Sequence, residues 1–113
     1  MEFKILNQID QLNEVDIQSH SKLQAIFKHS TRCSVSNMAK RILTSELEID
    51  NKKLLDVYYL DLISFREISN AISTQYSVQH ESPQILFIKD GKCVYYASHS
   101  DVSIIYALKQ ISK

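Results

Sequence analysis

A helical pattern that separates two strand-like segments constrains the fold of this chain more than any other feature. Residues 23–28 and 53–60 are short apolar runs, as expected for buried strands. Strands joined through a helix pair in parallel, because the helix returns the chain to the starting end of the sheet. The intervening helix begins at Cys33, and its predicted buried stripe is Val35, Met38, Ala39, Ile42 and Leu43. The pattern is that of an α/β protein.

Three further helices are predicted around these strands. Residues 7–20 have apolar side chains at roughly helical spacing and predict a short surface helix. Ser64 and Glu67 have the spacing of a capping box at the start of a second helix. Its expected buried side is Phe65, Ile68, Ala71, Ile72 and Tyr76. Ser100 and Asp101 are predicted to cap a last helix. Its expected apolar face is Ile104, Ile105, Leu108 and Ile111.

The only Gly of the chain follows Asp90, between the apolar runs 84–89 and 92–97. Asp-Gly between two such runs predicts a β-hairpin, because both turn positions take a positive φ. The hairpin adds an antiparallel pair to the parallel one, which gives a mixed four-stranded sheet with helices on both faces. A Cys at the start of the helix after the first core strand, with Pro83 before the hairpin, is the arrangement of the thioredoxin-like fold.

Composition excludes several functions. The 113 residues suit one domain, spanning 1–113, with one core. The 13 Lys and Arg residues balance 13 Asp and Glu residues, which argues against a nucleic-acid or membrane-surface binder. One Gly rules out glycine-rich phosphate loops, and two Cys cannot form a four-ligand zinc site, so no metal is expected. No signal peptide or long apolar stretch is visible, and we expect a cytoplasmic protein with reduced thiols.

Cys33 is the candidate reactive group. A thiol attacks a disulfide only as the thiolate, which the positive end of a helix dipole stabilises. Between Ile17 and Ser45 the sequence has no Asp or Glu. The basic residues of that stretch are Lys22, Lys28, Arg32, Lys40 and Arg41. Their charge favours the thiolate and attracts an anionic thiol.

Several short motifs, in order, resemble the YtxJ-type monothiol bacilliredoxins, thioredoxin-like proteins of the bacillithiol system. They are Ile26–Ser36, Tyr58–Asp61, Arg66–Ile72, His80–Gln84 and Ser98–Ser100. The family commonly has Pro directly after its Cys, whereas this chain has Ser34, so the start of the helix is less preorganised. The resemblance implies that bacillithiol, a low-molecular-weight thiol, is the co-substrate. It implies bacillithiolated proteins and a recycling reductase as partners.

The expected reaction is removal of bacillithiol from protein mixed disulfides by Cys33. Ser36 occupies the second position of a Cys-x-x-Cys motif, and its hydroxyl can hydrogen-bond the thiolate but cannot resolve a disulfide. By resemblance to thioredoxin-like proteins, Ser82-Pro83 is expected to be cis and to face Cys33. The full set of residues expected to bind the thiol substrate or stabilise the thiolate is His29, Thr31, Arg32, Ser36, Ser82 and Pro83. His80 is a weaker candidate.

Other interpretations remain open at this point. One alternative is a monothiol glutaredoxin-like carrier of an iron–sulfur cluster. The usual motif of those carriers is Cys-Gly-Phe-Ser, and this chain differs at both inner positions, Ser34 and Val35. Another alternative is a non-catalytic binding module of the same fold, in which Cys33 is inert. Cys93 is not expected to resolve the disulfide. Its place just beyond the Asp90-Gly91 turn puts it about 17 Å from Pro83 along the strand, so it should pack within the sheet.

Overall fold

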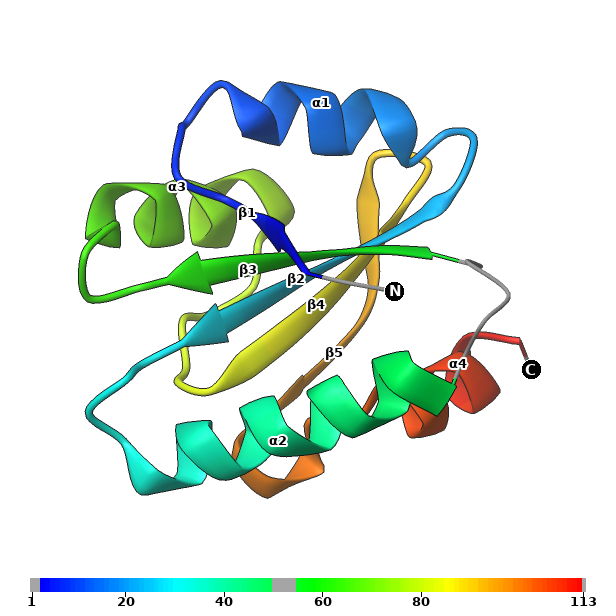
Figure 1. The fold of residues 1–113 in the computed structure, drawn as a ribbon. Coiled ribbons are helices and arrows are strands. Elements are labelled where there is room, and N and C mark those ends of the chain that lie inside the picture. The colour runs from blue at the N-terminus through cyan, green and yellow to red at the C-terminus, as the bar shows by residue number, and fades with distance from the viewer. Residues whose placement is uncertain (1–2, 50–54, 113) are drawn as a thin grey trace.

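A five-stranded mixed sheet forms the centre of the protein (Figure 1). The structure, a computed structural model, describes residues 3–49 and 55–112. Its elements in chain order are β1 (Lys4–Ile5), α1 (Gln11–Gln18), β2 (Leu23–His29), α2 (Ser34–Ile49), β3 (Leu55–Asp61), α3 (Arg66–Tyr76), β4 (Gln84–Lys89), β5 (Lys92–Ser98), the 3₁₀ helix η1 (His99–Asp101) and α4 (Ile104–Ile111). Lys53 and Leu54, predicted to begin the second core strand, lie outside the described residues.

The strand order is β1-β3-β2-β4-β5. As predicted, β2 and β3 pair in parallel, and β4 and β5 pair antiparallel. β4 also pairs antiparallel with β2, which joins the two pairs into one sheet. The unpredicted fifth strand, β1, pairs in parallel with β3. Its two residues, Lys4 and Ile5, are too few to show an alternating pattern in the sequence.

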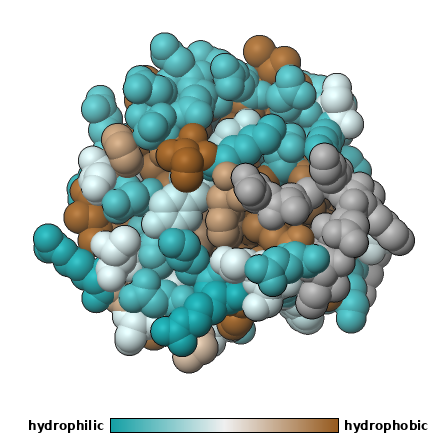
Figure 2. All heavy atoms as spheres, in the orientation of Figure 1, coloured by the Kyte–Doolittle hydropathy of each residue, from teal (hydrophilic) through white to brown (hydrophobic). Residues whose placement is uncertain are grey.

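Two layers of helices cover the sheet, α1 and α3 on one face and α2 and α4 on the other (Figure 1). β2 contributes to both cores, since Ala25 and Phe27 pack beneath α2 while Ile26 packs beneath α1 and α3. The side shown in Figure 2 is mostly hydrophilic, with isolated hydrophobic residues. Within the described ranges, no helix is both long and apolar enough to cross a membrane.

The predicted buried stripe of α2 is wrong in part. Ala39 and Leu43 are buried, but Val35, Met38 and Ile42 are 44%, 57% and 39% exposed. At 100° per residue, the buried residues Ser36, Ala39, Leu43 and Leu47 form the side that faces the sheet. Val35, Met38 and Ile42 lie on the adjoining side. The spacing of apolar residues in the sequence identified the apolar side of α2 correctly, but the sheet covers only part of that side.

Two predicted helix starts are also wrong. Ser64 does not cap α3, because its hydroxyl donates to Asp61 Oδ2 at 3.0 Å and Phe65 is the residue before the helix. α4 begins at Ile104 instead of after Asp101, because Ser103 Oγ accepts the Tyr106 N–H at 3.1 Å.

The carboxylate of Glu46 reinforces that start of α4. Glu46 Oε1 accepts the Ile104 N–H at 2.7 Å, and Oε2 accepts the Ser103 hydroxyl at 2.6 Å. Ile105, expected on the apolar face, is 41% exposed. α1 is shorter than predicted and buries Leu12 and Val15.

The predicted hairpin is confirmed. Asp90 and Gly91 have φ values of 52° and 75°, as a two-residue turn of this type requires. Both turn amides are bound by Ser19: its carbonyl accepts the Asp90 N–H at 3.0 Å and its hydroxyl oxygen accepts the Gly91 N–H at 2.9 Å.

Candidate functional site

Cys33 lies where β2 leads into α2. Its N–H donates to the Ser30 carbonyl at 3.2 Å, and its carbonyl accepts the Asn37 N–H at 3.0 Å as the first bond of the helix. Cys33 is half-buried, between exposed Arg32 and exposed Ser34. The first backbone N–H groups of a helix have no acceptor within the helix, so a thiolate here meets donors and the positive end of the dipole.

Of the five basic residues near Cys33 in the sequence, three are exposed and two are paired or buried. Lys22 Nζ binds Asp56 Oδ1 at 3.1 Å beside the start of β2, and Lys28 is fully buried. Arg32, Lys40 and Arg41 are exposed. Lys40 Nζ lies 5.0 Å from the ring centre of Tyr59. Arg32 is adjacent to Cys33 in the chain, and Asp61, which pairs with His29 in the sheet, adds a carboxylate to this end of β2, so the positive charge near Cys33 is smaller than the sequence indicated.

His29 and Ser36 meet beneath the start of α2. His29 is 1% exposed, and its Nδ1 lies 2.7 Å from Ser36 Oγ. The same hydroxyl oxygen accepts the Ser30 N–H at 2.9 Å. Burial is the main cause that lowers the pKa of His29, and Lys40 adds to it, so the ring is neutral near pH 7. Ser36 thus joins the end of β2 to the first turn of α2.

The Ser82-Pro83 peptide bond is cis, as expected. Gln84, the next residue, pairs with Lys28 in the sheet, which brings Pro83 beside the end of β2 that leads to Cys33. The Pro83 carbonyl accepts the His99 N–H at 2.8 Å. Ser82 Oγ is buried without a hydrogen-bond partner in the described part of the chain.

Thr31 is exposed, and its carbonyl accepts the Asn37 side-chain amide at 3.4 Å.

A buried lysine that the sequence did not reveal as such lies on the other face of the sheet. Lys28 Nζ is 3.3 Å from the Ser69 carbonyl, 3.1 Å from Ser73 Oγ and 3.4 Å from His80 Nδ1. Burial lowers the pKa of Lys28 to about 8. Burial, Lys28 and Arg66 lower the pKa of His80. His80, the weaker candidate, therefore binds Lys28 in the segment that precedes Pro83. A Lys inside an apolar strand was the only signal for this cluster.

Cys93 lies in β5 opposite Ile88, as predicted from the turn. Both cysteines are free thiols. Cys93 packs against the core beneath α1 and α3, and its Sγ is 3.4 Å from the Tyr95 carbonyl. Burial raises the pKa of Cys93. In residues 3–49 and 55–112, no three His, Cys, Asp or Glu side chains are grouped to hold a metal ion.

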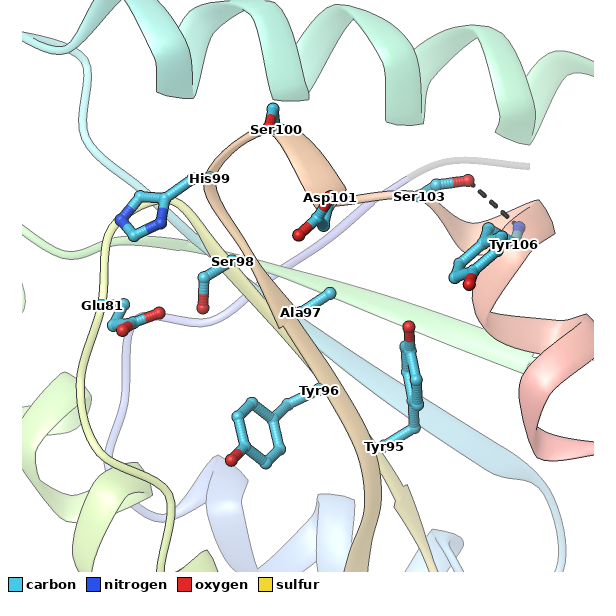
Figure 3. A pocket seen from close by; sticks show the side chains of 10 residues that line it. All are labelled: Glu81, Tyr95, Tyr96, Ala97, Ser98, His99, Ser100, Asp101, Ser103 and Tyr106. Carbon is cyan, nitrogen blue, oxygen red and sulfur yellow. Dashed lines mark hydrogen bonds between the residues drawn. The ribbon is translucent and has the colours of Figure 1, made fainter.

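Two hollows flank η1. A groove of about 310 Å³ separates it from α2, and its lining is Ser34, Val35, Met38, Ala39, Ile42, His99 and Ser100. A second hollow, of about 640 Å³, lies along β5 and is lined by Glu81, the consecutive residues Tyr95–Asp101, Ser103 and Tyr106 (Figure 3). His99 and Ser100 line both.

The sequence and the fold of this chain are similar to those of known proteins. Residues 4–105 match the family model described as monothiol bacilliredoxin BrxC. A solved structure assigned as an oxidoreductase with a thioredoxin fold is 28% identical, with a TM-score of 0.78, and the match covers 97% of this chain and 93% of that one. Thioredoxin of Malassezia sympodialis is 18% identical over 99% of this chain and 92% of its own, with a TM-score of 0.75. Arabidopsis thaliana thioredoxin O2 is 21% identical over 98% and 95%, with a TM-score of 0.72.

Proposed function

Because the chain belongs to the monothiol bacilliredoxin family, whose thioredoxin fold it shares, we propose that Cys33 removes bacillithiol from protein mixed disulfides. Membership of this family supports a general thiol-disulfide oxidoreductase activity. The observation that carries the specific proposal is the placement of Cys33 at the start of α2, with Ser36 one turn later. A thiol in this position is half-exposed, meets the unpaired N–H groups at the start of the helix, and has no second thiol beside it.

The reaction has one sulfur exchange in each half. The Cys33 thiolate attacks the bacillithiol sulfur of the mixed disulfide, and the new S–S bond forms as the old one breaks. The client cysteine leaves as a thiolate and takes a proton from water. Cys33 then holds bacillithiol in a mixed disulfide, until a second thiol or a reductase attacks it and returns the Cys33 thiolate. Electrons balance, because each disulfide broken is matched by one formed.

The other site residues act on charge and position in this proposal. Arg32 attracts the anionic thiol and stabilises the Cys33 thiolate. The Ser36 hydroxyl, held by His29, fixes the first turn of α2 instead of resolving the disulfide. Thr31 belongs to the loop that leads to Cys33. The backbone of Ser82, beside cis Pro83, would pair with the peptide-like part of the bound thiol. The chemistry requires a reducing compartment such as the cytoplasm.

Release of bacillithiol from a bacillithiolated protein tests this proposal. Intact-mass analysis should show the adduct moving from the client protein to the wild-type chain. Cys33→Ser should leave the client modified, and Cys93→Ser should behave as wild type. Oxidised glutathione, offered in place of oxidised bacillithiol, should modify Cys33 more slowly. Two results would contradict the proposal: equal rates of reaction with oxidised bacillithiol and oxidised glutathione, or transfer of bacillithiol to Cys33→Ser.

A further inference from the structure

The hollow beside β5 has the position of a sheet edge. Successive strand residues point to opposite faces, yet Tyr95, Tyr96, Ala97 and Ser98 all line this hollow (Figure 3). A space lined by both faces lies at the rim of the strand. β5 is the last strand of the sheet, so its outer edge is unpaired in the part of the chain that the structure describes. Backbone N–H and C=O groups of such an edge can pair with an added strand.

The charge of the hollow is opposite to that around Cys33. Glu81 and Asp101 contribute carboxylates, and Tyr95, Tyr96 and Tyr106 contribute rings, whereas none of the described Lys or Arg residues lines it. Carboxylates beside aromatic rings favour a Lys or Arg side chain, through ion pairing and cation–π contact. They offer no partner to the anionic low-molecular-weight thiol, which the positive charge of Arg32, adjacent to Cys33, favours instead.

The hollow connects to the site through η1. The His99 N–H is bound to the Pro83 carbonyl at 2.8 Å, and His99 also lines the groove that contains Ser34, the residue after Cys33. The four residues of β5 that end beside His99, Tyr95 to Ser98, span about 10 Å at ~3.3 Å per residue. An extended peptide that passes His99 would therefore align about four residues with β5.

We propose that the edge of β5 between Glu81 and Tyr106 binds an extended, positively charged segment of the client protein close in sequence to its modified cysteine. The proposal rests on the function proposed for Cys33. It divides the mixed disulfide between two surfaces: the anionic thiol faces the basic start of α2, and the polypeptide adds to β5 with its Lys or Arg side chains toward Glu81 and Asp101.

Exchange with matched peptides tests this assignment. Two short peptides carry a central cysteine disulfide-bonded to bacillithiol and differ only in having Lys or Glu around it. Wild type should exchange the Lys peptide about 5-fold faster, as kcat/KM, which is what two exposed ion pairs supply. Glu81→Gln with Asp101→Asn should abolish that preference and leave reaction with oxidised bacillithiol unchanged. Glu67→Gln, which removes an exposed carboxylate of α3, is the matched control.

A peptide with N-methyl groups on alternate residues separates strand addition from charge alone. It should lose most of the rate advantage if the backbone pairs with β5. A preference that survives the double substitution, or an N-methylated peptide that exchanges at the full rate, would overturn the proposal.

Two further measurements keep this test apart from that of the proposed function. A Lys peptide with Ser in place of its cysteine should still bind Cys33→Ser, and bind it more weakly once Glu81 and Asp101 are neutralised. That binding is expected even if no exchange occurs. Dimerisation of the protein through β5, seen by sedimentation and abolished by Tyr96→Lys, would assign the edge to a second copy and contradict the proposal.

Discussion

Cys33 and Cys93 are chemically identical side chains in opposite surroundings. Cys33 directly precedes α2, between exposed Arg32 and exposed Ser34. Cys93 lies within a strand opposite Ile88, against an apolar core, and burial raises the pKa of its thiol. The helix start favours the thiolate and the strand favours the neutral thiol. Position in the fold, rather than the residue type, therefore separates a reactive thiol from a packing one.

Exchanging each cysteine for serine should give the largest contrast. Cys33→Ser should lower the rate of disulfide exchange at least about 100-fold, because only a thiolate attacks the disulfide. Cys93→Ser should keep the rate within about 2-fold and lose about 1 kcal/mol of stability, because a hydroxyl replaces a half-buried sulfur. Exchange kinetics and urea unfolding measure the two effects. Equal loss of activity in both variants would mean that Cys93 takes part.

The buried ammonium of Lys28 should make the stability of the protein rise at alkaline pH. Its pKa is about 8 in the folded protein and 10.5 in the unfolded chain. Between these values the unfolded chain holds the extra proton, so the free energy of unfolding should increase with pH, by up to about 3 kcal/mol. Urea titrations of wild type and Lys28→Met across that range test this. The rise specific to wild type should be absent below pH 8. A constant difference between the two proteins would refute it.

Ser36 should matter to stability and Ser34 should not. Ser36→Ala leaves the Ser30 N–H without its acceptor and the buried His29 Nδ1 without its partner. The expected loss is about 2 kcal/mol in the free energy of unfolding. Ser34→Ala, at an exposed position of the same first turn, should change it by less than about 0.5 kcal/mol. Similar effects of the two substitutions would show that the His29–Ser36 bond does not hold the start of α2.

Charge reversal beside Cys33 should give the smallest effect, and only at that cysteine. Arg32→Glu should slow alkylation of Cys33 about 3-fold at low ionic strength, because the adjacent charge no longer favours the thiolate. Lys89→Glu, an exposed reversal in the hairpin, should leave Cys33 unaffected. Peptide-resolved alkylation rates measure both. An unchanged rate in Arg32→Glu would remove the local charge argument.

Local signals in the sequence predicted the parts of this molecule that depend on local structure. The Asp90-Gly91 turn, and through it the place of Cys93, follows from backbone conformations that few residues adopt. The parallel pairing of β2 and β3 follows from the helix between them. Cys33 was found by its place at the start of that helix.

Contacts between distant segments could not be predicted in this way. Lys28 meets His80 across 52 positions of the chain, and Glu46 meets Ile104 across 58, with no local pattern to indicate either contact. The exposure of Met38 depends on how much of α2 the sheet covers, which periodicity does not specify. The edge position of β5 likewise follows only from the strand order.

Peptide mapping of the oxidised protein tests the contrast between the two cysteines most directly. Wild type is mixed with oxidised bacillithiol, denatured, and alkylated before digestion. The expected result is a bacillithiol adduct confined to Cys33, with Cys93 free to react with the alkylating agent. A monomer two protons lighter, with a peptide in which Cys33 is cross-linked to Cys93, would contradict both the placement of the two cysteines and the monothiol mechanism.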